Sequence, residues 1–221
     1  MNNIKYILLD AYGTFINTRS GSVDAAAKIL AKRGSSLDAA EFYARWKAMH
    51  RSNMRTQERF IPEREMYARE LEVLYGEYGI DGDAREDVAI MLASMLDRHF
   101  YPEAKEMFSR LSRRFRLVVA SNTDTAPLMQ NLEYNDYAFE RVYTSEALGC
   151  YKPAPEFYRQ ILSDLGCSPR EALFAGDSPE EDVIAPGSLG MTTVFVDRGN
   201  TGAQWGQTFT VTDLSGLSAL L

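Results

Sequence analysis

The stretch ILLDAYGTF, residues 7–15, places an aspartate directly after a short run of apolar residues. A continuous apolar run of this length predicts a strand buried on both faces, as in a parallel sheet covered by helices. Gly13 and Thr14 follow Asp10 in a predicted turn, where glycine frees the backbone and exposed amides can face an anion. The stretch therefore predicts a buried strand that ends at an acidic side chain.

Three further apolar runs resemble the first, and helical patterns separate them. The predicted strands cover residues 6–9, 116–120, 172–175 and 193–196. Amphipathic patterns begin near residues 126 and 155, and Pro102 is expected at the entry to another helix. Strands that alternate with helices predict an α/β fold with a doubly wound parallel sheet.

Residues 20–97 have a different pattern. They contain no strand-like run, and their apolar residues recur at intervals of three and four, as in Phe42, Trp46 and Met49. This spacing predicts three or four amphipathic helices inserted after the first strand. The chain returns to the sheet near residue 98.

Composition excludes several classes of protein. The 221 residues are 45% apolar and 25% charged, as in ordinary globular proteins. A net charge of −7 argues against a nucleic-acid partner. No apolar stretch reaches the roughly 18 residues of a membrane helix, and Asp10 interrupts the first one where a signal peptide would stay apolar. We expect a cytoplasmic protein without a membrane partner, with Cys150 and Cys167 as free thiols.

Polar residues follow the predicted strands where functional groups gather in such sheets. Ligands bind at the carboxyl ends of the strands, and these ends carry Asp10, Ser121, Asn122 and Asp177, with Lys152 before the helix near Pro155. In GDSPEED, residues 176–182, Ser178 is expected to cap a helix with Glu181 as its capping-box partner. Taken singly, each of these residues is more often a turn or cap residue. Their convergence at one edge favours a functional site.

Four short motifs, in order, resemble those of the haloacid dehalogenase superfamily. They are Asp10-x-x-Gly13-Thr14, Ser121-Asn122, Lys152-Pro153 and Gly176-Asp177-Ser178-x-x-x-Asp182. The resemblance implies a Rossmann-like catalytic core over residues 1–16 and 98–221, and a helical cap over residues 17–97. It also implies that Asp10 is a covalent nucleophile and that Ser121 and Lys152 steady the substrate anion by holding its phosphoryl oxygens. Mg²⁺ would be bound by Asp10, Asp177, Asp182 and the backbone carbonyl of Tyr12, with Thr14 orienting the nucleophile.

Two features of the sequence point to different branches of that superfamily. Most of its phosphatases carry a second aspartate at the position of Tyr12. A tyrosine stays protonated at neutral pH and can donate a proton but not readily accept one. Tyr12 and the stretch VFVDRGNTGAQWGQTF, residues 194–209, resemble instead the 2-haloacid dehalogenases, in which an arginine such as Arg45 on a cap helix would bind the substrate. Asp177 points the other way, because metal-free dehalogenases carry a neutral residue there.

We give Asp177 more weight than Tyr12. The leading hypothesis is a Mg²⁺-dependent phosphatase for a small anionic metabolite, with Asn122 assisting substrate binding. The second is a metal-independent 2-haloacid dehalogenase, in which Arg45 contacts the substrate. The third is a catalytically weak binding module. A monomer or a homodimer fits each hypothesis.

Overall fold

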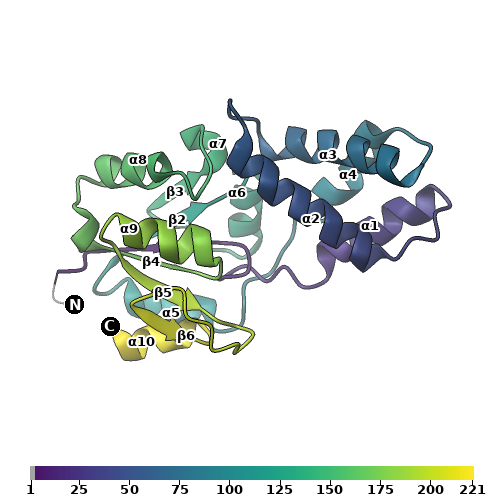
Figure 1. Ribbon diagram of the computed structural model, residues 1–221. Helices are drawn as coiled ribbons and strands as arrows, with labels where there is room; N and C mark the ends of the chain where they lie inside the picture. The colour runs from purple at the N-terminus through teal and green to yellow at the C-terminus, as the bar shows by residue number, and fades with distance from the viewer. Residues whose placement is uncertain (1–2) are drawn as a thin grey trace.

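The computed structural model describes residues 3–221, which form a parallel sheet with helices on both faces and a bundle of four helices beside it (Figure 1). The six strands lie in the order β3-β2-β1-β4-β5-β6, and every neighbouring pair is parallel. Their bounds are β1 (Tyr6–Leu9), β2 (Arg116–Ser121), β3 (Arg141–Thr144), β4 (Ala172–Gly176), β5 (Thr192–Val196) and β6 (Phe209–Val211). The predicted doubly wound α/β fold is confirmed.

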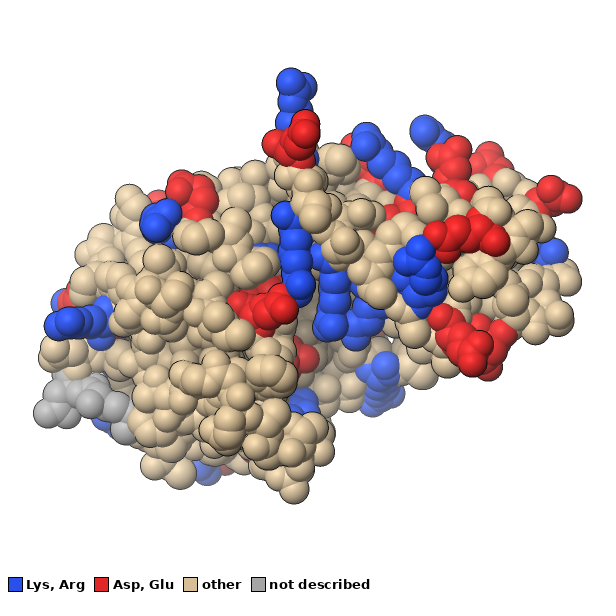
Figure 2. Space-filling model, in the orientation of Figure 1, with Lys and Arg blue, Asp and Glu red and all other residues tan. Residues whose placement is uncertain are grey.

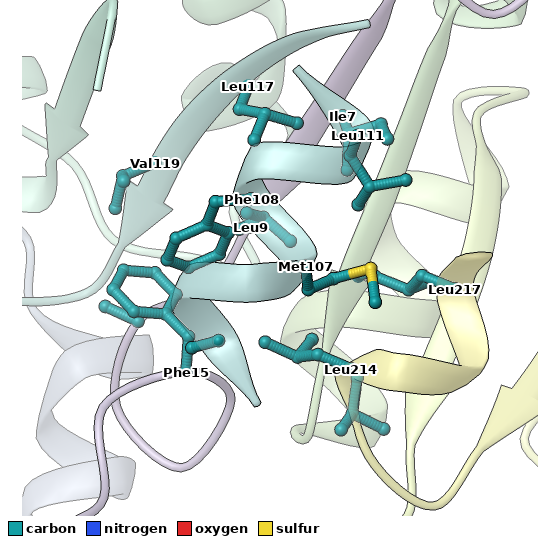
Figure 3. Packing of buried hydrophobic residues seen from close by; sticks show 14 of the residues in the cluster. Ile7, Leu9, Phe15, Met107, Phe108, Leu111, Leu117, Val119, Leu214 and Leu217 are labelled. Atoms are coloured by element: carbon teal, nitrogen blue, oxygen red, sulfur yellow. The ribbon is translucent and has the colours of Figure 1, made fainter. Parts of the chain in front are cut away.

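Strand β1 lies in the middle of the sheet and is buried on both faces. Ile7 and Leu9 pack on one face, while Tyr6 and Leu8 pack on the other. On the first face, Figure 3 shows Ile7 and Leu9 among side chains of α5 (Ala104–Leu111) and of the C-terminal Leu214 and Leu217. Removing this apolar surface from water from both sides explains why the run is continuous rather than alternating.

The remaining helices cover the sheet or connect its strands. Helices α5 and α10 lie on one face, and α8 and α9 lie on the other. The bounds are α6 (Thr125–Tyr134), α7 (Ser145–Leu148), α8 (Pro155–Leu165), α9 (Ala185–Ser188), α10 (Leu217–Leu220), the 3₁₀ turns η1 (Pro169–Glu171) and η3 (Leu214–Gly216), and the π-helix η2 (Pro179–Ile184). Helices α6 and α8 match the amphipathic patterns from residues 126 and 155.

The inserted segment forms four helices, α1 (Gly21–Lys32), α2 (Ala39–Thr56), α3 (Glu63–Tyr78) and α4 (Ala84–Ala93), which we call the helical insertion. It has its own apolar cluster around Trp46 and Leu71. The chain leaves and re-enters the sheet unit side by side, because Ile16 bridges Phe100 and the Asn17 amide donates to the His99 carbonyl at 2.9 Å. The two segments that connect the insertion to the sheet therefore lie side by side, next to β1.

Two strands, β3 and β6, were not predicted from the sequence patterns. Strand β3 lies at one edge of the sheet and β6, three residues long, lies at the other. Edge strands bury less of their surface, so they lack the continuous apolar run of central strands. Within residues 3–221, no helix combines the length and apolar character needed to span a membrane. Cys150 and Cys167 are free thiols, as predicted.

Candidate active site

The carboxyl edge of the sheet brings the predicted site residues together. Asp10 directly follows β1, Ser121 ends β2, and Asp177 directly follows β4. Because β1 pairs with both β2 and β4, the side chain of Asp10 lies between the other two. Ser121 Oγ donates a hydrogen bond to Asp10 Oδ1 at 3.3 Å. Residues more than a hundred positions apart in the sequence thus meet at one point.

Lys152 is fully buried and holds two carboxylates. Its Nζ donates to Asp10 Oδ1 at 2.8 Å and to Asp182 Oδ1 at 2.7 Å. Burial alone would lower the pKa of Lys152, but the negative charges of Asp10 and Asp182 raise it well above its ordinary value. The ammonium therefore stays charged. It lies behind Asp10 rather than on the cavity surface, so it fixes the orientation of the Asp10 carboxylate.

The segment after β4 differs from the expected capping box. Ser178 is the residue before the helix, but Glu181 does not bond back to it; Asp182 Oδ2 accepts from the Ser178 amide at 2.9 Å instead. The wider turn of a π-helix moves the fourth residue, rather than the third, over that amide. A Cβ at Gly176 would lie 2.2 Å from Asp182 Oδ2, so glycine is required there. Both Asp182 oxygens are therefore engaged within the protein.

Asp177 faces Asp10 without a cation of its own. Within residues 3–221 no Lys or Arg lies within ion-pair distance of it. The Thr14 hydroxyl is 3.1 Å from Asp10 Oδ2 and 3.2 Å from Asp177 Oδ1, but its single proton serves only one of them at a time. Solvent reaches Asp177 through the cavity, but the protein buries its other sides. This burial is the larger cause, and the negative charge of Asp10 the second, that raises the pKa of Asp177 to about 6.

This group of oxygens fits a divalent cation. Asp10, Asp177 and Asp182 each offer a carboxylate oxygen, and the three oxygens lie within 4.8 Å of one another. Mg²⁺ prefers such hard oxygen ligands. The Tyr12 carbonyl accepts no hydrogen bond from residues 3–221 and remains available as a ligand. Because both oxygens of Asp182 accept hydrogen bonds, Asp182 fits a supporting position better than a direct one.

Asn122 and Arg198 hold the backbone around these groups. Asn122 Nδ2 donates to the Lys152 carbonyl at 2.9 Å, and Asn122 Oδ1 accepts from the Lys152 amide at 2.7 Å. Its carboxamide therefore positions Lys152, and its predicted contact with substrate stays a prediction. The Arg198 guanidinium donates to the carbonyls of Gly13 and Thr14. The sequence analysis missed Arg198, although it lies in the tail segment singled out there.

Tyr12 is held as a neutral phenol at the edge of the cavity. Its hydroxyl accepts a hydrogen bond from Asn131 Nδ2 at 3.0 Å, and the Arg98 guanidinium lies 5.5 Å from the ring centroid. Burial, followed by the charge of Glu63, raises the pKa of Tyr12 to about 12. The side chain can donate a hydrogen bond but does not act as a base near neutral pH.

A cavity of about 290 Å³ separates the carboxyl edge of the sheet from the helical insertion. Asp10, Ser121 and Asp177 line one wall. The opposite wall carries the charged side chains Arg19, Lys47, Arg51, Glu63 and Arg98 together with His50. Figure 2 shows Lys and Arg side chains gathered along this groove, across from acidic ones.

The prediction that Arg45 reaches the cleft is wrong. Arg45 lies outside the cavity lining, and its guanidinium pairs with Glu77 Oε1 at 2.5 Å on the exposed side of α2. Trp46 is buried in the insertion, so its two neighbours in sequence leave the helix on opposite sides. Lys47, not Arg45, faces the cleft. Lys47 and Arg51, one turn apart, form a pair that helical spacing could have revealed.

The insertion also buries a charged group that the sequence analysis missed. His50 Nδ1 lies 3.0 Å from Glu70 Oε2, and His50 Nε2 lies 3.2 Å from Glu63 Oε1. Burial alone would lower the pKa of His50, but the hydrogen bonds and charges of Glu63 and Glu70 raise it to about 9. The protonated ring therefore links α2 to the first residue of α3 beside the cavity.

A family model of haloacid dehalogenase-like hydrolases matches residues 4–190, which include all four motifs and the helical insertion. The chain belongs to the haloacid dehalogenase-like hydrolases. The predicted family and the prediction of a hydrolase are confirmed. The family model is shared by enzymes with different reactions, so it does not select a substrate.

Curated proteins that this hydrolase resembles in sequence include phosphatases. A phosphoserine phosphatase of Thermus thermophilus is 36% identical over 103 residues, 45% of this chain and 41% of that protein. A glyceraldehyde 3-phosphate phosphatase of Methanopyrus kandleri is 36% identical over 61 residues, which are 28% of this chain and 26% of that phosphatase. The chain thus spans less than half the length of these curated relatives.

Solved structures of this family share the whole fold. A magnesium-bound hydrolase of Bacillus subtilis has a TM-score of 0.85 at 18% identity, with 99% of each chain covered. The L-2-haloacid dehalogenase of Xanthobacter autotrophicus has a TM-score of 0.80 at 20% identity, with 98% of each chain covered. Identities this low establish only the common fold, so the reaction has to be inferred from the residues of the site.

Proposed function

We propose that the protein is a Mg²⁺-dependent phosphatase that acts on a small phosphorylated metabolite. Asp10 is the nucleophile, and Asp10, Asp177 and the Tyr12 carbonyl hold the metal, with Asp182 in support. Thr14 and Lys152 orient and charge-balance the nucleophile. The Ser121 hydroxyl, which lines the cavity, offers a hydrogen bond to a phosphoryl oxygen. Residues 17–97 are the cap that closes over this site.

One observation carries the proposal: the unneutralised carboxylate of Asp177 beside Asp10. Lys152 is the buried cation nearby, and it is committed to Asp10 and Asp182. Without a further cation, two facing carboxylates would repel each other and any anionic substrate. Asp10, Asp177 and the Tyr12 carbonyl would hold a Mg²⁺ that, when bound, would neutralise these carboxylates and offset the charge of the phosphoryl oxygens.

The reaction proceeds in two displacements at phosphorus. An Asp10 carboxylate oxygen attacks phosphorus, forming an aspartyl-phosphate as the bond to the leaving oxygen breaks. A water molecule then attacks phosphorus, the bond to Asp10 breaks, and the free carboxylate and inorganic phosphate result, with one proton of the water kept by the phosphate and the other released to solvent. An alkoxide leaving group needs a proton, and neutral Tyr12 is a poor source because its pKa is about 12. We therefore expect aryl phosphates to be hydrolysed faster than alkyl phosphates.

The test is hydrolysis of p-nitrophenyl phosphate with Mg²⁺ and after treatment with EDTA. Chelation should abolish turnover and added Mg²⁺ should restore it. Asp177→Asn should lower kcat/KM by about 100-fold or more and raise the Mg²⁺ concentration needed for half-maximal rate. Asp81→Asn, at an exposed position of the insertion, is the matched control and should leave both values unchanged. Full activity in EDTA, or a normal Mg²⁺ response in Asp177→Asn, contradicts the proposal.

Tyr12 favours a second candidate, a 2-haloacid dehalogenase. A departing halide needs no proton, so a phenol that cannot act as a base costs this reaction little in its first step. Chloride release from 2-chloropropionate in the presence of EDTA, lost in Asp10→Asn, would establish this activity. A folded protein that hydrolyses p-nitrophenyl phosphate and releases no chloride removes it.

A further inference from the structure

The wall of the cavity formed by the helical insertion is rich in positive charge. Lys47 and Arg51 come from α2, Arg19 from the connection before α1, and Arg98 from the connection after α4. All four line the cavity that also exposes Asp10 on its opposite wall. The molecule as a whole is acidic, with a net charge of −7, so the charge of this basic wall is opposite in sign to the net charge of the protein.

Three of these cations have no acidic partner. Within residues 3–221 no carboxylate lies within ion-pair distance of Arg19, Lys47 or Arg51. Arg98 is engaged structurally, since it donates to the Ser94 carbonyl and to the Ser22 hydroxyl. Outside the cavity, by contrast, Arg45 and Arg55 of the same helix are paired with Glu77 and Glu180.

Lys47 and Arg51 repel each other across one turn of α2. Partial burial, followed by the charge of Arg51, lowers the pKa of Lys47, while Asp177 acts in the opposite direction. Lys47 therefore lies close enough to both Arg51 and Asp177 for their charges to act on it. Cations held together without a counterion gain from an anion placed between them, and an arginine favours a carboxylate or phosphate through paired N–H donors.

The phosphoryl group itself does not account for this charge. The reacting phosphorus must lie within reach of Asp10, where Ser121 and the proposed metal site receive its oxygens. The leaving group then extends toward α2. A cavity of about 290 Å³ is at the small end for ligand pockets, so a leaving group of a few atoms would reach Lys47.

We propose that Lys47 and Arg51, with Arg19 beside them, bind a second anionic group of the substrate. The preferred substrates are then short phosphomonoesters whose leaving group carries a carboxylate or a second phosphate. This inference rests on the proposed phosphatase activity and names its substrate class. Both anions satisfy the same cations, and the experiment distinguishes them.

Three probes of equal chain length test the subsite: propyl phosphate, 3-phosphonooxypropanoate and propane-1,3-diyl bisphosphate. In the Mg²⁺-loaded protein, at least one of the two probes that carry a second anionic group should exceed propyl phosphate in kcat/KM by about 10- to 100-fold. The probe with the larger advantage identifies the second anion. The double variant Lys47→Gln/Arg51→Gln should reduce that advantage to nearly one, mainly through KM, and should lower kcat/KM for propyl phosphate by a smaller factor than for the preferred probe.

Arg45→Gln is the matched control, because it removes a charge from the same helix outside the cavity. It should preserve the order of the three probes. Equal kcat/KM for all probes in the parent protein, or an equal loss for all probes in the double variant, overturns the inference.

A binding measurement separates this inference from the proposed function. Asp10→Asn, which cannot form the aspartyl-phosphate, should bind the preferred extended probe about 10-fold or more tightly than propyl phosphate in calorimetry. That preference should disappear when Lys47→Gln and Arg51→Gln are added. If the parent protein hydrolyses none of the probes but this preference holds, the phosphatase proposal fails and the anion subsite stands. Without the preference, the subsite fails whatever the turnover.

Discussion

The two walls of the cavity differ in how their charges are arranged. On the sheet wall, Asp10 and Asp182 share the buried ammonium of Lys152. On the insertion wall, Lys47 and Arg51 are exposed to the cavity and have no carboxylate partner among residues 3–221. The first wall is fixed by internal hydrogen bonds, and the second leaves its charges free for a ligand.

We therefore expect the sheet wall to carry out the reaction and the insertion wall to select the substrate. Groups that are oriented before substrate arrives can stabilise a transition state without further rearrangement. Charged side chains without a partner contribute little until an anion binds to them. Substitutions on the sheet wall should therefore reduce turnover of every substrate, whereas substitutions on the insertion wall should change which substrate is preferred.

Asp10→Asn should give the largest effect and sharpens the comparison most. Removing the nucleophilic oxygen should lower kcat for p-nitrophenyl phosphate by about 10⁴-fold or more, because an amide cannot form the covalent intermediate. The loss should be similar for alkyl and aryl phosphates, as expected for the sheet wall. Turnover within tenfold of the parent protein would show that Asp10 is not the nucleophile.

Tyr12→Asp should give a smaller effect of opposite sign. A carboxylic acid at this position can protonate a leaving alkoxide, so kcat/KM for alkyl phosphates, which reports the step that forms the aspartyl-phosphate, should rise by about 10- to 100-fold. The kcat/KM of aryl phosphates, whose leaving groups need no proton, should change little. Tyr12→Phe controls for loss of the hydroxyl bond to Asn131 and should not reproduce the gain. An equal gain in kcat/KM for both classes would contradict a role in protonating the leaving group.

The smallest effect concerns stability of the insertion. The pKa of His50 rises from 6.5 to about 9 in the folded protein, so protonated His50 stabilises the fold fully below about pH 6.5. This contribution is lost as the pH rises through about 9, and should amount to about 1–3 kcal/mol. Urea unfolding at pH 6 and pH 9.5 measures it.

The two histidines provide the comparison for that measurement. His50→Gln should flatten the loss of unfolding free energy between the two pH values. His99→Gln, at an exposed position in one of the two segments that connect the insertion to the sheet, should leave it as in the parent protein. An identical pH dependence in the parent and both variants would show that His50 does not contribute to the pH dependence of the free energy of unfolding.

Sequence patterns found the sheet wall because its residues stand at strand ends. Asp10, Ser121 and Asp177 each close a buried apolar run, and parallel strands bring such ends to one edge. The insertion wall was harder to predict. The stripe of Phe42 and Trp46 located the buried side of α2, but not which flank faces the cleft. The prediction therefore named Arg45, whereas Lys47 faces the cleft.

The sequence by itself determined the family, the doubly wound sheet and the group of acids at its edge, since these follow from local order along the chain. Only the tertiary structure decided the partners of each charge. Lys152 is committed to Asp10 and Asp182, while Lys47 and Arg51 are left without a carboxylate among residues 3–221. The reason is physical: charge pairing depends on distances of a few ångströms between segments far apart in sequence, which no local pattern encodes.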